Sequence, residues 1–329
     1  MCTLIVLHRC VPGKPLVVAA NRDEFFARPA EGLALRTSKT GPILSPLDLE
    51  AGGTWVGLSQ RGVFAGLTNL RPREAAGGKN PQSQSKETEK EAPKKLLSRG
   101  GVVMAALEAE SANAAMQTLM QLEEEAYNPF QLVVADGRDG WLIVYRDSPR
   151  AIELTPGPHI VGNVEDEAVE QVLGSLSDVN ASDSEAGSET EREAESFGKE
   201  GKSRAPEPAC FPGFEGIEGL VDTEEPRAMK LTRIRERVEK LMIDPGGDLL
   251  ERLAGVCQEH VEFKAGEGSP FESTCVHVAD RYGTRSSLLL ELATETESSR
   301  LWTTDGPPCE QSFEDRSSLL GSLGVRLSG

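Results

Sequence analysis

The sequence predicts an α+β fold in which antiparallel sheets and helices are stacked in layers. Short runs of β-branched and apolar residues come in pairs joined by turn residues, which is typical of hairpins and therefore of antiparallel sheets. Segments with the apolar spacing of helices separate these strand pairs. No strand pattern leads into a glycine-rich loop that opens a helix, which argues against dinucleotide-binding and P-loop folds.

The N-terminal part of the chain predicts two hairpins. The first pairs residues 3–7 with 16–20 across the turn residues at 12–15, where two prolines flank glycine and lysine. The second pairs residues 54–58 with 63–68 across a glycine-containing turn. Both pairs are rich in valine, leucine and threonine, as strands of a half-buried sheet should be.

The rest of the chain predicts helices where apolar residues recur every three to four positions and strands where short apolar runs follow turn signals. The expected elements are helices at 96–107, 112–125, 228–242 and 249–256, strands at 130–135, 141–145, 159–163, 274–278 and 286–292, a loop at 295–313 and a closing element at 319–327.

We expect a single domain over residues 1–329 that carries two polar insertions. Residues 71–95 contain almost no apolar side chains, and residues 175–212 are acidic and rich in serine. Such segments bury too little apolar surface to offset the entropy lost on ordering. We therefore expect both insertions to be disordered.

Charge and cysteine content limit the classes of partner and cofactor. The formal net charge of −18 argues against nucleic acid and anionic membrane surfaces as partners. No segment approaches the roughly 18 apolar residues of a membrane span, so we expect no transmembrane segment. The six cysteines are scattered without a CxxC pair, so the sequence predicts no metal site, no disulfide framework and no cofactor. Cysteines used in this way, without a secretory signal, favour a cytoplasmic protein.

The N-terminus and a polar cluster at the end of the second strand form the first candidate site. Counting along the first hairpin pairs residues whose numbers add up to about 26, which places Cys2 opposite residues 22–24. Removal of Met1 would give Cys2 an α-amino group that can act as a base beside its own thiol. Arg22 would favour the thiolate, and Asp23 would bind the α-ammonium group.

Each candidate also has a structural interpretation. Cys2 is also explained as a small apolar residue of the first strand, with the polar cluster as a solvated strand end. Asn69 and Asn163 each follow a predicted strand, where an amide can donate to an oxyanion or simply terminate the strand. Arg285 stands at the entry to a late strand, as an anion contact or as a surface turn residue.

Several motifs resemble those of one known family. They are "MC" at the start, "NRDE" at 21–24, "GGTWVGLSQRGVFAGLTN" at 52–69, "SRG" at 98–100, "YNPFQLVVAD" at 127–136 and "YGTRSS" at 282–287. In this order they resemble the NRDE family, also called the transport and Golgi organization protein 2 family. The two polar insertions fall outside the motifs.

The resemblance implies a fold and a set of site residues. The family is similar to N-terminal nucleophile hydrolases of the choloylglycine hydrolase and penicillin V acylase type, whose fold is a four-layer αββα sandwich. By motif, their nucleophile, the carboxylate that holds the α-amino group and two asparagines correspond here to Cys2, Asp23, Asn69 and Asn163. We expect Asn21, Arg22 and Arg285 to contact the substrate. The hydrolases place an arginine three residues before this aspartate, where the present chain has Ala20.

For function, the resemblance implies a role in Golgi organisation and secretion and in lipid or haem homeostasis, on a hydrolase scaffold. The ligand would be a small molecule, namely a lipid, an acyl thioester or haem, and the protein would be cytoplasmic and associated with the Golgi or the mitochondrion. The alternative is a cysteine N-terminal nucleophile amidase or thioesterase, which cleaves an amide or an acyl thioester. The sequence predicts no oligomeric state.

Overall fold

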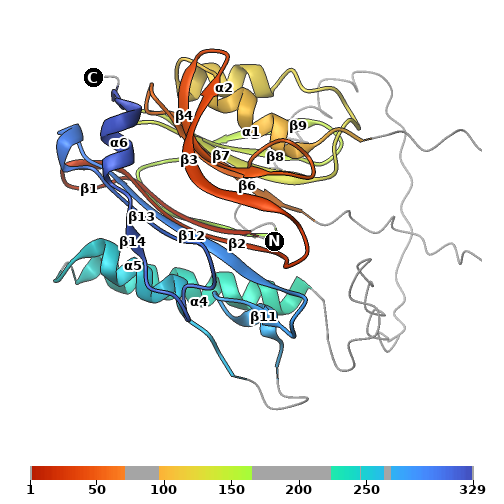
Figure 1. Ribbon diagram of the computed structural model, residues 1–329, viewed down its shortest axis with the longest axis vertical. Helices are drawn as coiled ribbons and strands as arrows, with labels where there is room; N and C mark the ends of the chain where they lie inside the picture. The colour runs from red at the N-terminus through yellow and green to blue at the C-terminus, as the bar shows by residue number, and fades with distance from the viewer. Residues whose placement is uncertain (1, 71–95, 165–223, 245, 263–267, 328–329) are drawn as a thin grey trace, which may run out of the picture.

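The computed structural model describes residues 2–70, 96–164, 224–244, 246–262 and 268–327. Two antiparallel sheets lie face to face, with α1 and α2 over the outer face of one and α4 and α5 over the outer face of the other (Figure 1). This confirms the predicted α+β class and the four-layer αββα arrangement.

The first sheet, sheet A, contains both the N-terminal hairpin and the C-terminal strands. Its strand order is β10-β1-β2-β12-β13-β14, and β11 pairs with β12. Every pairing is antiparallel. The bounds are β1 Cys2–Val11, β2 Lys14–Phe25, β10 Gly157–Val161, β11 His277–Val278, β12 Tyr282–Leu292, β13 Arg300–Thr304 and β14 Glu314–Asp315.

The second sheet, sheet B, follows the order of the chain from β3 to β9. Consecutive strands pair as antiparallel hairpins throughout. The bounds are β3 Ala30–Ser38, β4 Gly41–Asp48, β5 Val56–Ser59, β6 Phe64–Asn69, β7 Phe130–Ala135, β8 Gly140–Tyr145 and β9 Pro149–Glu153.

The helices of the described residues are amphipathic and bury one face each against a sheet. Ser111 and Asp248 cap α2 and α5 by accepting hydrogen bonds from the backbone N–H groups of Ala114 and Glu251. The bounds are α1 Arg99–Leu107, α2 Ala112–Leu119, α4 Glu224–Ile243, α5 Leu249–Cys257 and α6 Ser318–Leu323, with 3-10 turns at Pro270–Glu272 and Thr296–Ser298.

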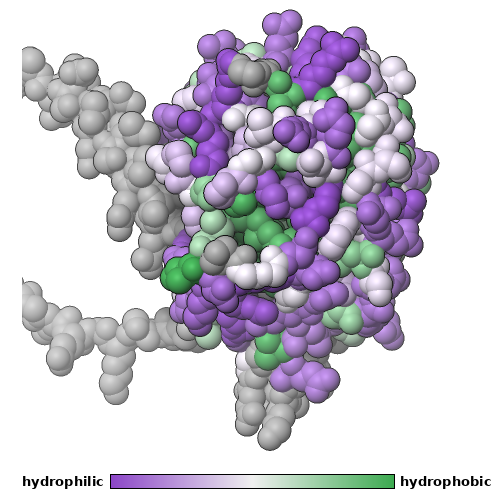
Figure 2. Space-filling view, turned by 90° about the vertical axis from the view of Figure 1, so that its left-hand side faces the viewer, coloured by the Kyte–Doolittle hydropathy of each residue, from purple (hydrophilic) through white to green (hydrophobic). Residues whose placement is uncertain are grey.

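Three apolar cores hold the layers together. One lies between the two sheets, with Leu4, Val18 and Phe64 among its fully buried members. The second joins sheet B to α1 and α2, and the third joins sheet A to α4 and α5. The face drawn in Figure 2 is mostly hydrophilic, and a group of its hydrophobic side chains lies in a central depression.

Most element predictions agree with the structure, and the exceptions have physical causes. The loop predicted at 295–313 was wrong, because Arg300–Thr304 forms β13, whose few apolar residues stand among charged and polar ones. The β3–β4 hairpin was not predicted, because β3 lies at the edge of sheet B and buries none of its residues fully. Only His277–Val278 of the strand predicted at 274–278 forms a ladder, and the helix predicted at 112–125 ends at Leu119. The insertions predicted at 71–95 and 175–212 lie outside the described residues.

Candidate functional site

A cavity of about 760 Å³ opens at the N-terminal end of β1. The end of β2, the β4–β5 connection, β6 and the start of α1 form its walls. Five of the predicted site residues line it, namely Cys2, Arg22, Asp23, Asn69 and Arg285. Apolar side chains such as Leu67 and Trp55 complete the lining. The cavity is therefore large enough for a small molecule and is partly apolar.

The register of the first hairpin decides what faces Cys2. Pro12 and Gly13 form the turn, and Gly13 takes a φ of 71°, which a glycine adopts without steric cost. A register shift between His8 and Val11 changes the pairing, so Cys2 lies directly opposite Arg22. This is the first residue of the range that counting along the strands predicted.

Asn163 connects Cys2 to Asn69. The backbone N–H of Cys2 donates to Oδ1 of Asn163 at 3.2 Å, and Nδ2 of Asn163 donates to the carbonyl oxygen of Asn69 at 2.6 Å. The side chain of Asn163 thereby ties the first residue of β1 to the last residue of β6, across the two sheets. Three residues that are far apart in the sequence meet at this point.

Asp23 is almost completely buried and is held from the side of α4. Its Oδ1 accepts a hydrogen bond from the hydroxyl of Thr284 at 2.6 Å, and Nζ of Lys230 lies 3.7 Å from Oδ2. Lys230 is itself buried, and burial lowers the pKa of its ammonium group below 10.5. A buried carboxylate needs such partners, since an isolated charge would be costly in this environment.

The other members of the polar cluster have separate tasks. Asn21 donates from Nδ2 to the carbonyl oxygens of Cys257 and Thr274, both at 2.9 Å, and does not line the cavity. It therefore joins β2 to the helical layer. Arg22 and Glu24 lie at the cavity, 3.9 Å apart, and Glu24 is also 3.9 Å from Arg28.

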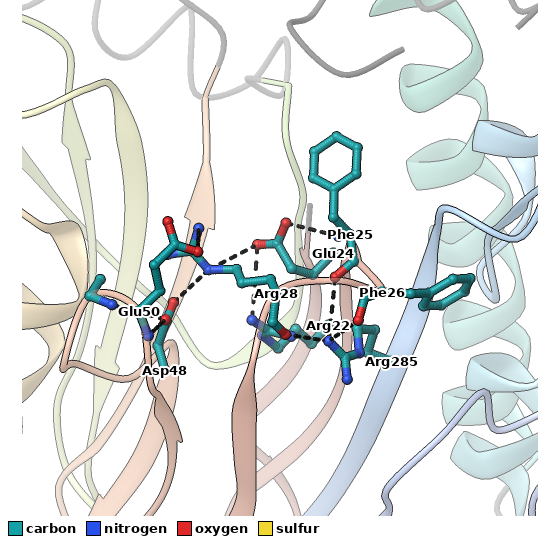
Figure 3. Close-up of polar contacts among 9 residues, drawn as sticks. Arg22, Glu24, Phe25, Phe26, Arg28, Asp48, Glu50 and Arg285 are labelled. Atoms are coloured by element: carbon teal, nitrogen blue, oxygen red, sulfur yellow. Dashed lines mark hydrogen bonds and ion pairs between the residues drawn. The ribbon is translucent and has the colours of Figure 1, made fainter.

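Arg28 and Arg285 fix the rim of the cavity (Figure 3). Arg28 donates from Nε to Asp48 at 2.8 Å and lies 3.5 Å from Glu50, so it ties the segment after β2 to the end of β4. Arg285 donates to the backbone carbonyls of Phe25, Phe26 and Arg28, so its guanidinium is engaged with the protein itself.

Burial dominates the chemistry of Cys2. The residue is only 7% exposed, and this burial raises the pKa of its thiol above 9.0. A protonated thiol is a weak nucleophile. Arg99 also lines the cavity, and burial lowers the pKa of its guanidinium, which still stays charged at neutral pH. Within the described residues it donates a hydrogen bond to the carbonyl oxygen of Pro129, at 3.2 Å.

Two glycines explain why helix α1 can come so close to the cavity. A Cβ atom added to Gly53 would lie 2.5 Å from the backbone carbon of Gly100, and one added to Gly100 would lie 3.0 Å from the Cα of Gly53. Both residues line the cavity and belong to the "GGTW" and "SRG" motifs. The glycines of these two motifs therefore allow a close contact between the backbones of the two segments.

Sequence reasoning did not predict Lys230, Thr284, Arg28 or Arg99 as parts of the site. Lys230 and Thr284 lie more than two hundred residues from Asp23 along the chain, as the printed numbering shows. One signal was available for Thr284, because the "YGTRSS" motif contains it. Arg99 stands in the same way within the "SRG" motif.

With this geometry in hand, comparison with known proteins decides the family. The family model described as Transport and Golgi organisation 2 matches residues 1–300. The chain belongs to this family.

Curated relatives of the Transport and Golgi organisation 2 family match part of the chain. The Transport and Golgi organization 2 homolog of Mus musculus is 34% identical over 157 residues, and the Homo sapiens protein of the corresponding name is 35% identical over 160 residues. Each alignment covers 45% of this chain and 50% of the relative. The chain thus matches about half the length of these curated relatives.

The fold is also found in a solved hydrolase. The C2A mutant of the conjugated bile acid hydrolase from Clostridium perfringens superposes with a TM-score of 0.51, over 100% of this chain and 96% of that chain. Sequence identity is 12%, so the likeness concerns the fold alone. In the described part of this family member, no helix has both the length and the apolar character needed to cross a bilayer.

Proposed function

We propose that this protein binds a small acyl-bearing lipid or haem in the cavity beside Cys2, and that it serves Golgi organisation and secretion and lipid or haem homeostasis through this binding. The observation that carries the proposal is the cavity itself, about 760 Å³, with a partly apolar wall and a partly buried arginine, Arg99. Such a combination suits an amphipathic ligand with an anionic end. The family name supports the cellular part of the proposal.

The state of Cys2 favours binding over catalysis. Burial raises the pKa of its thiol above 9.0 while Met1 precedes it, and a protonated thiol is a weak nucleophile. Ala20 occupies the position at which the hydrolases that the sequence resembles carry an arginine. Asp23, which would hold an α-amino group in such an enzyme, already has Lys230 at 3.7 Å and Thr284 at 2.6 Å.

A tryptophan of the cavity wall provides the test. Trp55 lines the cavity, so its fluorescence should be quenched saturably by palmitoyl-coenzyme A or by haemin. Arg99→Met should weaken binding of the ligand that is recognised about tenfold or more, since a charge-assisted contact contributes about 1.5–3 kcal/mol. Arg61→Met is the control, because Arg61 does not line the cavity and contacts Glu108 instead.

Two results would contradict the proposal. One is the absence of saturable quenching by either ligand, and the other is equal quenching by wild type and by a Trp55→Phe variant. The second result would mean that the ligand binds elsewhere.

One observation favours a second candidate function, cysteine-dependent cleavage of an amide or an acyl thioester. The side chain of Asn163 accepts a hydrogen bond from the backbone nitrogen of Cys2 at 3.2 Å and donates one to the carbonyl oxygen of Asn69 at 2.6 Å. After removal of Met1, this arrangement would place the α-amino group and thiol of Cys2 and a side-chain amide around the carbonyl group of a bound substrate. This function requires removal of Met1. Intact-mass measurement of the purified protein with Met1 still attached would exclude it.

A further inference from the structure

A cluster of two thiols and one imidazole lies away from the cavity, where β11 meets the loop that follows β13. Cys275 precedes β11, His277 begins it, and Cys309 belongs to the loop between β13 and β14. The Sγ atoms of the two cysteines are 3.3 Å apart, and Nε2 of His277 lies 3.5 Å from the sulfur of Cys275 and 3.1 Å from that of Cys309. All three potential ligand atoms therefore converge on one point.

These distances fit the edges of a tetrahedral metal site. With Zn–S bonds of about 2.3 Å and Zn–N bonds of about 2.0–2.1 Å, two sulfurs lie about 3.8 Å apart and a sulfur and a nitrogen about 3.6 Å apart. The three edges of the cluster are shorter than these values by about 0.5 Å or less. Small side-chain rotations would thus admit a metal ion.

A carboxylate orients the imidazole for this purpose. Nδ1 of His277 lies 3.6 Å from Oε1 of Glu310, on the side of the ring opposite to the thiols. A carboxylate on this side of the ring attracts the Nδ1 proton electrostatically, which favours the tautomer whose Nε2 lone pair is free for a metal ion. The ring of His260 packs edge-on against that of His277 with centroids 4.6 Å apart, and Nδ1 of His260 lies 3.1 Å from the carbonyl oxygen of Cys275.

We propose that Cys275, His277 and Cys309 bind one zinc-type transition metal ion, with the fourth coordination position open to solvent. Two thiolates and one imidazole form a ligand set that zinc prefers, whereas calcium and magnesium require oxygen ligands. Cys275 is buried and Cys309 is exposed, so the ion would be anchored on the protein side and reachable from solvent. Neither cysteine is part of a disulfide.

The site is also connected to the cavity. The backbone N–H of Val276, between Cys275 and His277, donates to the hydroxyl of Thr284 at 2.8 Å. The same hydroxyl donates to Asp23 at 2.6 Å. The metal site therefore shares a hydrogen-bond partner with the carboxylate beside Cys2, although the inference does not depend on the function proposed for the cavity.

Cobalt provides the test, because Co²⁺ replaces zinc in tetrahedral thiolate sites and absorbs light there. The full-length protein, reduced without oxygen, should bind one equivalent of Co²⁺ with a thiolate-to-cobalt charge-transfer band, and Zn²⁺ should bleach this band. Cys309→Ser should remove about half of the band intensity, since one of two thiolates is lost. Glu310→Gln should weaken cobalt binding about 10- to 100-fold, as is usual for the partner of a ligating histidine.

The two variants change exposed residues, so both should fold. Cys10→Ser is the matched control, because Cys10 lies in β1 outside the cluster, and it should leave the cobalt spectrum unchanged. The proposal is overturned if the reduced wild type shows no charge-transfer band, or if Cys309→Ser retains the full band. Peptide mapping that finds a Cys275–Cys309 disulfide in protein purified under reducing conditions would overturn it as well.

Discussion

Sheet A carries sulfur in two different settings, one on the face toward sheet B and one beyond the end of β12. On the face toward sheet B, Cys2 is buried in a cavity wall, and burial raises the pKa of its thiol. Beyond the end of β12 that pairs with β11, Cys275 and Cys309 approach each other and an imidazole within 3.5 Å. The first arrangement isolates a thiol, whereas the second concentrates ligand atoms. Position in the sequence alone does not reveal this difference, because both sites depend on residues that the fold brings together.

The largest effect is expected from removing the cation beside Asp23. Lys230→Met leaves a buried carboxylate without the ammonium group of α4, so the free energy of unfolding should fall by about 3 kcal/mol. Urea unfolding measures the change. Lys240→Met is the control on the same helix, because Lys240 is exposed, and it should change stability by less than about 0.5 kcal/mol. Equal stability of the wild type and Lys230→Met would show that the burial of Asp23 does not depend on Lys230.

The same pair predicts a pH dependence. Burial lowers the pKa of Lys230 below 10.5 in the folded protein, so unfolding takes up a proton between that lowered pKa and 10.5. The stability of the wild type relative to Lys230→Met should therefore rise with pH through this window. Unfolding curves for the two proteins, recorded from neutral pH to about pH 10, near the upper end of this window, measure the trend. A constant difference would contradict the lowered pKa.

A smaller effect should follow from cutting the hydrogen-bond link between the cavity and the cluster of Cys275, His277 and Cys309. Thr284→Val removes the hydroxyl that donates to Asp23 and accepts from the N–H of Val276, which should cost about 1–3 kcal/mol. Thr3→Val is an isosteric control, because the buried hydroxyl of Thr3 has no hydrogen-bond partner among the described residues. It should be neutral or slightly stabilising. If both variants unfold at the same urea concentration, the hydroxyl of Thr284 does not link the cavity to the cysteine–histidine cluster in the way described.

The smallest effect concerns the rim. Asp48→Asn weakens the contact with Arg28, which is partly exposed, so the loss should be below about 1 kcal/mol. Burial acts to raise the pKa of Asp48, but the hydrogen bond from Arg28 and those from backbone N–H groups hold it below 3.8. The stability that Asp48 contributes should therefore be present above pH 3.8 and disappear as the pH falls through the lowered pKa.

Glu50→Gln is the control for this rim contact. Glu50 is 3.5 Å from Arg28, but its side chain is 61% exposed. Its replacement should change stability little at any pH. A loss equal to that of Asp48→Asn would mean that charge rather than the hydrogen bond of Asp48 holds the rim.

Local patterns made the fold class and part of the cavity predictable. The turn at Pro12 and Gly13 fixes a hairpin, and the hairpin brings Cys2 opposite Arg22. Two apolar runs on either side of a glycine-containing turn likewise indicated the β5–β6 hairpin, which ends at Asn69. These features depend on neighbours in the sequence, so periodicity and turn chemistry are sufficient to find them.

The remaining features depend on contacts that no local pattern encodes. Lys230 reaches Asp23 from a helix, and Cys309 reaches His277 from a loop that carries no metal-binding spacing. Asn21 stands next to Arg22 in the sequence, yet it binds carbonyls of the helical layer, because successive residues of a strand face opposite sides of the sheet. A single sequence gives the residue types of such sites but not their partners.

The most direct test of the account compares wild type with Cys2→Ala in the binding and turnover of palmitoyl-coenzyme A. If the cavity binds its ligand without chemistry at Cys2, both proteins should bind with dissociation constants within about threefold, a difference below about 0.7 kcal/mol. Neither should release free palmitate. An acyl adduct on a Cys2 peptide that lacks Met1, with palmitate released by the wild type alone, would contradict the account.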